Sequence, residues 1–394
     1  MKRIWLAVLP ALVLGEILGG CAHLDITAPK KDADKSSPAG RAVQSVKERY
    51  APDSHLAIFN VGLQHRGHEL VLTGDVDRAE AKVDVIRAVE RTGARVTDRI
   101  NVLPTQQLSN RVWGIACLSV ASGRELPDHK AEMGTQVLMG EVVRVWKQST
   151  NVNFPWFLAQ APDGYVSWVE GGTIIRCDRE QVDAWNREPL LVVTAFEERI
   201  LEQPKADAQP VSDVVMCDRL KKTGEEGDWY RVELPDGRAG YLAKKAAEDF
   251  NTWKQARQPT AENIERTARS FVGRPYLWGG YSTKGFDCSG FTEQVFYING
   301  IDLVHSAAAQ ARLGVAVPFD VDLSQLRKGD LLFFGRRARG GRPERITHVG
   351  IYLGNKMFIQ SSQRVRVSSL DPNSPTREEY RIHSLLAARR VLNP

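Results

Sequence analysis

The alternation of apolar and polar residues predicts a small α+β unit near the N-terminus. Residues 55–63 and 68–76 have the pattern of two strands, and residues 79–93 repeat apolar side chains at helical spacing. Residues 95–104 have the pattern of a further strand. We therefore expect a small α+β domain over residues 46–110.

The middle of the chain carries one pattern of short strands twice. Residues 131–170 alternate apolar and polar positions around an Asp-Gly turn and end in a Gly-Tyr strand with a tryptophan. Residues 227–246 repeat the tryptophan, the Pro-Asp-Gly turn and the Gly-Tyr strand. Asp-Gly turns alone are common in the hairpins of all-β proteins, but their recurrence among the same neighbours favours a duplicated module. We expect two small all-β barrels, over residues 113–185 and 190–250.

The last domain, expected over residues 258–394, opens with a helix and then places a cysteine at the start of another. Apolar spacing predicts the first helix from Thr260 and the second over residues 289–298, directly after Cys288. Free amide groups and the dipole at a helix start favour a thiolate, which would activate Cys288 as a nucleophile. A buried structural cysteine at a helix start is the alternative interpretation.

A β-hairpin later in this domain is expected to carry a general base. If its loop has three residues centred on Gly354, His348 lies opposite Gln360, whereas a two-residue loop would place His348 opposite Ser361. A cysteine nucleophile needs a base, and the base needs a polar partner that fixes its tautomer. Cys288, His348 and Gln360 can fill these roles. The alternative is a histidine and a glutamine on an exposed strand face.

Composition narrows the class of protein. The chain has 394 residues, is 42% hydrophobic and 26% charged, and has a net charge of +5. This length is sufficient for about two to four domains, and the composition excludes disorder or collagen as a description of the whole chain. Since no long run of basic residues occurs, no nucleic-acid partner is expected. Five cysteines are too few for a disulfide scaffold. One bridge among Cys117, Cys177 and Cys217 remains open.

The N-terminal segment has the features of an export signal. A basic start, an apolar run and small residues precede Cys21, so residues 1–20 are interpreted as a signal peptide. Leu-Gly-Gly-Cys resembles a bacterial lipobox, which implies that Cys21 carries lipid; an ordinary export signal or an uncleaved anchor is the alternative. Residues 21–45 are polar and lack apolar periodicity, which predicts a lipidated tether. Ala22 is not the aspartate that retains such proteins at an inner membrane, so we expect an outer-membrane lipoprotein that faces the periplasm.

Four motifs of the last domain occur in an order that is specific to one peptidase family. They are PYLWGG, GFDCSGF, LRKGDLLFF and THVGIYLG. In this order they resemble the NlpC family of papain-like cysteine peptidases of bacterial cell walls. The duplicated module resembles the bacterial SH3-like domains of cell-wall enzymes, and residues 113–394 together are similar to γ-D-glutamyl-L-diamino-acid endopeptidases. Residues 46–110 bear a fainter resemblance to BON domains.

This resemblance implies the fold of the last domain and the roles of its residues. The domain should be a papain-like α+β peptidase domain that needs no metal or other cofactor. Cys288 would be the nucleophile, His348 the general base, and Gln360 the third polar residue, at a position where the family more often has histidine. Two groups of residues are implied at the substrate pocket: Tyr276, Trp278, Asp287 and Ser289 around the nucleophile, and Glu132 and Tyr165 from the first SH3-like domain.

The function implied is hydrolysis of peptidoglycan stem peptides or muropeptides. The bond would join γ-D-glutamate to a diamino acid, diaminopimelate or lysine, in peptides with a free N-terminal L-Ala. A non-catalytic wall-binding scaffold is one alternative, against which the intact set of Cys288, His348 and Gln360 argues. An amidase or acyltransferase that uses the same Cys-His pair is another, which only work with substrates can separate.

Overall fold

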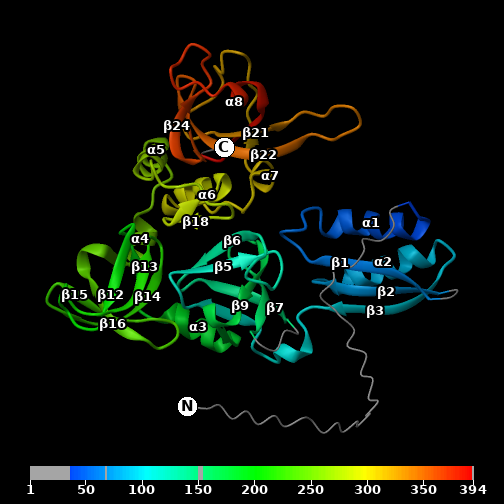
Figure 1. The fold of residues 1–394 in the computed structure, drawn as a ribbon, viewed down its shortest axis with the longest axis horizontal. Helices are drawn as coiled ribbons and strands as arrows, with labels where there is room; N and C mark the ends of the chain where they lie inside the picture. The colour runs from blue at the N-terminus through cyan, green and yellow to red at the C-terminus, as the bar shows by residue number, and fades with distance from the viewer. Residues whose placement is uncertain (1–35, 67–68, 150–153, 393–394) are drawn as a thin grey trace, which may run out of the picture.

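The computed structural model describes residues 36–66, 69–149 and 154–392. The predicted signal peptide and the lipidation at Cys21 lie outside the described residues. Figure 1 shows four units along the chain, with the N-terminal unit and the second barrel on opposite sides of the first barrel. The expected order, a small α+β unit, two all-β units and a C-terminal α+β domain, is confirmed. Among the helices of the described ranges, none is long and apolar enough to span a bilayer.

The N-terminal unit is a three-stranded sheet with two helices. Its sheet has the order β1-β2-β3, in which β1 and β2 are antiparallel and β2 and β3 are parallel. Leu72, Val85 and Val89 are fully buried between sheet and helices. The predicted strands and the helix at residues 79–93 are thus confirmed. The elements are α1 (Pro38–Tyr50), β1 (Phe59–Arg66), β2 (Glu69–Val76), α2 (Ala79–Glu90) and β3 (Arg95–Val102).

Helix α1 contradicts the expectation that residues 21–45 form a polar tether throughout. The Ser37 side chain caps the helix, and Pro38 occupies its first turn, where a missing N–H costs nothing. Val43 and Val46 lie on the face that packs against α2. The helix was missed because its buried face consists largely of small residues, and its stability comes from packing against α2, which a local pattern does not reveal.

Each barrel contains a seven-stranded sheet. The strand order is β10-β4-β7-β8-β9-β5-β6 in the first and β13-β12-β16-β15-β14-β11-β17 in the second. The first barrel contains β4 (Trp113–Ala116), β5 (Val120–Arg124), β6 (Met133–Leu138), β7 (Val142–Gln148), β8 (Trp156–Gln160), β9 (Val166–Glu170) and β10 (Ile174–Cys177), followed by α3 (Arg179–Arg187). The second contains β11 (Leu190–Val193), β12 (Glu197–Leu201), β13 (Pro210–Val215), β14 (Arg219–Glu226), β15 (Trp229–Glu233), β16 (Ala239–Ala243) and β17 (Ala247–Asp249).

The two barrels share local chemistry as well as strand pattern. Gly164 and Gly237 turn the β8–β9 and β15–β16 hairpins with φ of +90° and +86°, a conformation that glycine adopts without strain. In each barrel a buried carboxylate accepts a hydrogen bond from the backbone amide three residues earlier. Glu141 accepts from Leu138 at 2.9 Å, and Asp218 accepts from Val215 at 2.8 Å. The repeated sequence pattern therefore corresponds to a repeated structure.

The C-terminal domain is a six-stranded antiparallel sheet with α6 packed on β22 and β23. Thr260 caps α5 as predicted, since its hydroxyl accepts the Asn263 amide at 3.2 Å. Phe271, Phe286 and Phe291 are fully buried between helices and sheet. Helix α4 (Phe250–Ala256) precedes the domain and packs on β11 and β17 of the second barrel. The elements of the domain are α5 (Ala261–Ser270), β18 (Tyr281–Ser282), β19 (Gly285–Phe286), α6 (Cys288–Ile298), α7 (Ala307–Gln310), β20 (Val315–Ala316), β21 (Leu331–Arg336), β22 (Arg345–Gly354), β23 (Met357–Ser362), β24 (Arg364–Ser369), α8 (Glu379–Ser384) and β25 (Leu385–Arg390), with sheet order β20-β25-β21-β22-β23-β24.

Candidate active site

Cys288 is the first residue of α6, as the sequence predicts, and Asp287 caps the helix. The Asp287 carboxylate accepts hydrogen bonds from the Gly290 amide at 2.7 Å, the Ser289 hydroxyl at 2.9 Å and the Gly279 amide at 3.1 Å. Only 8% of Cys288 is exposed. Asp287 and Ser289 therefore lie beside the cysteine as expected, and Asp287 holds both the helix start and the loop that precedes it.

Gln360 orients the His348 imidazole. His348 Nε2 lies 2.6 Å from Gln360 Oε1. Because an amide oxygen can only accept, Nε2 carries the hydrogen and Nδ1 is left as the proton acceptor. Gln360 Nε2 donates to Ser368 Oγ at 2.9 Å, which determines which end of the amide faces the imidazole. The structure thus brings His348 and Gln360 together as the sequence predicts.

The contact between His348 and Gln360 forms although the register of the β22–β23 hairpin differs from both registers considered from the sequence. Ile351 pairs with Ile359, the loop has two residues with positive φ, and a β-bulge lies beside Gly354. In this register Gln360 lies two residues from the position opposite His348, so the two side chains are diagonal neighbours on one face. The direct opposition predicted was wrong because the extra residue of a bulge shifts the pairing.

The imidazole-bearing strand lies against the start of α6. Strand β22 packs against α6, and the backbone of Val349, the residue after His348, acts to lower the pKa of the Cys288 thiol. Burial, followed by the charge of Asp287, raises the pKa of Cys288 to about 12. Burial, followed by the charge of Arg381, lowers the pKa of His348 to about 3. Burial therefore favours a neutral thiol and a neutral imidazole in the resting pair, whereas the amides at the helix start favour the thiolate.

Arg381 of α8 is a charged neighbour of this pair that the sequence analysis did not select. Its guanidinium lies 5.4 Å from the centroid of the Phe334 ring, and the same ring lies 5.9 Å from that of His348. Its positive charge lowers the pKa of both Cys288 and His348. Such a charge favours a thiolate or an oxyanion once one forms. Arg381 lies outside all four motifs, and only the packing of α8 against β21 brings it to the site.

The aromatic residues expected at the pocket differ in their surroundings. Burial, followed by the charges of Cys288 and Asp287, raises the pKa of Tyr276, which places its hydroxyl in their electrostatic environment. Trp278 is 58% exposed. Tyr276 is therefore partly buried near the charges of the site, whereas Trp278 is open to solvent.

The first barrel packs on the loop that leads to Cys288. Gln136 Oε1 accepts hydrogen bonds from the backbone amides of Tyr281 at 2.9 Å and Ser282 at 3.1 Å. A Cβ at Gly279 would lie 2.7 Å from the Met133 carbonyl oxygen, so only glycine allows this approach of the two backbones. The barrel is therefore in direct contact with the active-site loop.

Tyr165 reaches the site from the first barrel, but the acid beside it is Glu125. The Tyr165 hydroxyl donates to Glu125 Oε1 at 2.9 Å, and both Glu125 and Glu132 are exposed. Glu132, the acid expected at the pocket together with Tyr165, is therefore not the carboxylate that binds the Tyr165 hydroxyl. The Glu125 amide donates to the Glu132 carbonyl at 3.0 Å, so the two acids face each other at the end of one hairpin. Their sequence positions do not reveal which carboxylate meets the tyrosine.

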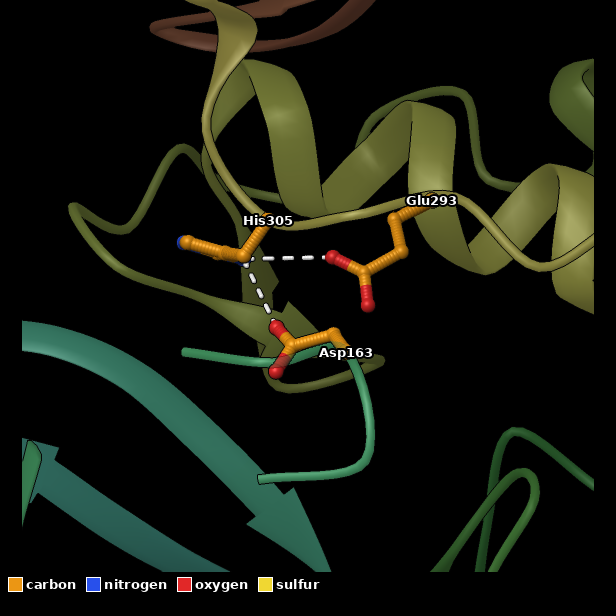
Figure 2. A group of neighbouring side chains, drawn as sticks. All are labelled: Asp163, Glu293 and His305. Carbon is orange, nitrogen blue, oxygen red and sulfur yellow. Dashed lines mark hydrogen bonds and ion pairs between the residues drawn. The ribbon is translucent and has the colours of Figure 1, made fainter. Parts of the chain in front are cut away.

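A buried ionic cluster joins the first barrel to α6 (Figure 2). His305 Nδ1 lies 3.1 Å from Glu293 Oε2 and 3.6 Å from Asp163 Oδ2, and His305 Nε2 lies 3.8 Å from Asp287 Oδ2. Burial alone would lower the pKa of His305, but the hydrogen bond to Glu293 and the charges of Asp287, Glu293 and Asp163 outweigh it and raise the pKa to about 10. His305 is therefore an imidazolium at neutral pH and links the barrel to the cap of the cysteine helix.

The sequence analysis missed this cluster because its members belong to different units. The donor atoms of Asp163, Glu293 and His305 all lie within 4.8 Å of one another, a spacing that could also hold a metal ion. In the structure the carboxylates instead bind the imidazolium. Among these three residues only Asp163 belongs to a recognisable motif, the Asp-Gly turn. That turn predicts a hairpin and gives no indication of a buried ionic cluster.

We expect the stabilisation from His305 to depend on pH. Its folded pKa lies above its unfolded value of about 6.5. The contribution is therefore complete below about pH 6.5, declines as the pH rises, and is lost above about pH 10. His305→Gln should cost about 3 kcal/mol near pH 6, because it removes the imidazolium from a buried cluster of acids whose pKa values burial already raises. Thermal unfolding of both proteins at pH 6 and pH 9.5 measures the difference.

The control for this prediction is His383→Gln, which alters an imidazole that is 73% exposed and should have little effect at either pH. A difference between wild type and His305→Gln that is as large at pH 9.5 as at pH 6 would contradict the assignment of charge to His305.

The remaining described cysteines are unpaired. Cys117, Cys177 and Cys217 are buried and free, so the bridge left open among them does not form. Burial raises the pKa of all three thiols, that of Cys117 to about 11. None of the three lies at a helix start with a nearby imidazole, which distinguishes them from Cys288.

Comparisons with known proteins agree with this geometry. The model of the NlpC/P60 family matches residues 273–387, and that of the bacterial dipeptidyl-peptidase Sh3 domain matches residues 123–172. Gamma-D-glutamyl-L-lysine dipeptidyl-peptidase of Bacillus cereus is 32% identical over 267 residues, which cover 66% of this chain and 76% of the relative. Dipeptidyl-peptidase 6 of Lysinibacillus sphaericus is 27% identical over 262 residues, covering 63% and 88%.

A solved structure extends the match to three dimensions. The crystal structure of an NlpC/P60 family protein from Bacillus cereus superposes with a TM-score of 0.58 at 26% identity, over 71% of this chain and 99% of that one. These matches confirm the expected SH3-like domain followed by a papain-like peptidase domain of the NlpC type. The chain therefore belongs to the NlpC/P60 family and is a cysteine peptidase.

Proposed function

We propose that this protein is a peptidoglycan endopeptidase that cleaves the bond between γ-D-glutamate and a diamino acid in stem peptides. The observation that carries the proposal is a thiol at the start of α6, which packs against the strand whose imidazole Gln360 orients, in a chain whose first barrel packs on the active-site loop. The name of the Bacillus cereus relative, a gamma-D-glutamyl-L-lysine dipeptidyl-peptidase, supports this choice of bond.

The proposed reaction follows from the resting protonation states. As Cys288 Sγ attacks the scissile carbonyl, its proton passes to His348 Nδ1, and the tetrahedral oxyanion forms near the amides at the start of α6. The imidazolium then protonates the leaving amine of the diamino acid. Water, deprotonated by His348, hydrolyses the thioester and restores the thiol. Gln360 maintains the tautomer but is neutral, so it does not offset the transient charge on the imidazole.

We further propose that the substrate is a short peptide with a free N-terminal L-Ala. Glu125 and Asp287 lie at the two ends of a chain of contacts through Tyr165 and His305, next to Cys288. An ammonium group in such surroundings needs nearby negative charge. The contact of the first barrel with the loop before Cys288 leaves less space for a glycan attached to the amine.

Mass spectrometry of products from L-Ala-γ-D-Glu-diaminopimelate peptides tests the proposed bond. We expect L-Ala-γ-D-Glu and a peptide that begins with the diamino acid. Release of free L-Ala would indicate an amidase that hydrolyses a different bond, transfer to an added amine would indicate an acyltransferase, and an unchanged peptide would indicate a binding scaffold. Each of these three outcomes would overturn the proposal.

We also propose that the chain is exported and anchored in the outer membrane by lipid on Cys21. Acyl chains supply most of the membrane affinity of such a protein. Labelled fatty acid should therefore be incorporated into wild type and into Cys288→Ser, but not into Cys21→Ser, which should leave the detergent-extracted fraction. Absence of label from wild type would refute the lipid anchor.

A further inference from the structure

The segment that links α1 to β1 in the N-terminal unit lies on the β8–β9 hairpin of the first barrel. The Val166 amide donates to the His55 carbonyl at 2.7 Å, and Gln160 Nε2 donates to the Leu56 carbonyl at 3.2 Å. The Leu56 side chain lies 3.5 Å from the position of a Cβ at Gly164. The N-terminal unit is therefore bonded to the hairpin that carries Tyr165.

His55 from this segment contacts both members of the Tyr165–Glu125 pair. Its ring stacks on Tyr165, with centroids 5.0 Å apart and an interplanar angle of 17°. Its Nδ1 lies 3.8 Å from Glu125 Oε1, the same oxygen that accepts the Tyr165 hydroxyl. His305 meets the Tyr165 ring edge-on at 4.9 Å. Two imidazoles, one from the N-terminal unit and one from the peptidase domain, thus hold the tyrosine.

These contacts restrict groups that would otherwise be mobile. The Glu125 side chain is 40% exposed, and an exposed glutamate samples several rotamers that binding must reduce to one. The His55 amide donates to Asp53 Oδ1 at 3.0 Å, so the backbone that carries the imidazole is itself held in a turn. A carboxylate that is oriented before binding loses less entropy when an ammonium arrives.

We propose that His55 is a positioning residue of the substrate-amine site and that the N-terminal unit is thereby part of the substrate specificity of the enzyme. His55 orients Glu125 and Tyr165 toward the free amine and has no part in bond cleavage. The inference rests on the proposed preference for a free N-terminal amine. His55 precedes the residues matched by either family model, so this part of the site lies outside the two matched modules.

The test compares two peptides in the full-length enzyme. L-Ala-γ-D-Glu-diaminopimelate and its N-acetylated form are assayed with wild type, His55→Ala, His55→Phe and the control His65→Ala, which alters an exposed histidine of the same unit. We expect His55→Ala to lower kcat/KM about fivefold or more for the free peptide, through KM and not kcat, and to leave the acetylated peptide unchanged. His55→Phe keeps the stacking and should recover part of the loss, while His65→Ala should match wild type.

The outcomes separate this inference from the proposed function. If wild type prefers the free amine and His55→Ala retains that preference, or if His55→Ala slows both peptides equally, the positioning role of His55 is overturned and the proposed function stands. If wild type cleaves both peptides at the same rate, the amine site itself is overturned, and the role of His55 with it. Thermal unfolding of each variant verifies that the compared proteins are folded.

Discussion

Cys288→Ala should abolish peptide hydrolysis, with a loss of at least about 10⁴-fold in kcat, while the chain remains folded. The sulfur is the proposed nucleophile, and the binding groups and oxyanion donors that remain provide only a small residual rate. Removal of one small side chain at the start of α6 leaves its Asp287 cap in place. Steady-state kinetics together with circular dichroism measure the two parts of the expectation.

Cys217→Ala is the matched control, since Cys217 is also buried and free. It should retain activity because no imidazole is oriented toward it. Turnover that persists in Cys288→Ala, or that disappears in Cys217→Ala while the protein remains folded, would refute the proposed nucleophile.

Acetylation of the substrate amine should slow hydrolysis by a factor on the order of a hundred or more. It removes the ammonium charge and adds bulk where Tyr165 and Glu125 meet. The loss of one partly buried charge contact of about 3 kcal/mol corresponds to this factor. The ratio of kcat/KM for the free and acetylated peptides is the measurement.

The same ratio tests which acid holds the amine. Glu125→Gln should reduce the preference for the free amine, because Glu125 is the carboxylate bonded to Tyr165. Glu132→Gln changes an exposed acid across the same hairpin and should leave the ratio near that of wild type. Equal rates on free and acetylated peptides would show that the enzyme acts on stems whose amine is not free.

Features that depend on residues close together in the chain were predictable. The start of α6 at Cys288 follows from the Asp287 cap and the apolar spacing after it. The start of α5 follows from the Thr260 cap. The two Asp-Gly hairpins follow from turn chemistry, because positive φ at the glycine requires no partner elsewhere. Hydrophobic periodicity, helix caps and turns each depend on only a few neighbouring residues, so these features could be predicted from the sequence alone.

Features that depend on distant partners were decided by the tertiary structure. The sequence pointed to the His348–Gln360 contact, but a bulge placed it in another register. It placed Glu132 and Tyr165 at the pocket, but the carboxylate that binds Tyr165 is that of Glu125, across the β5–β6 hairpin from Glu132. Arg381 and His55 reach the site only because α8 and the N-terminal unit pack there.

The protonation of the active site shows the physical reason for this division. By itself the sequence determined that a cysteine begins a helix and that a histidine follows on a later strand. The helix start favours a thiolate, yet burial raises the pKa of Cys288 to about 12 and lowers that of His348 to about 3. Desolvation depends on every group that excludes water, and those groups come from strands and helices far apart in the chain. Only the assembled fold therefore decides which protonation state the local motif adopts.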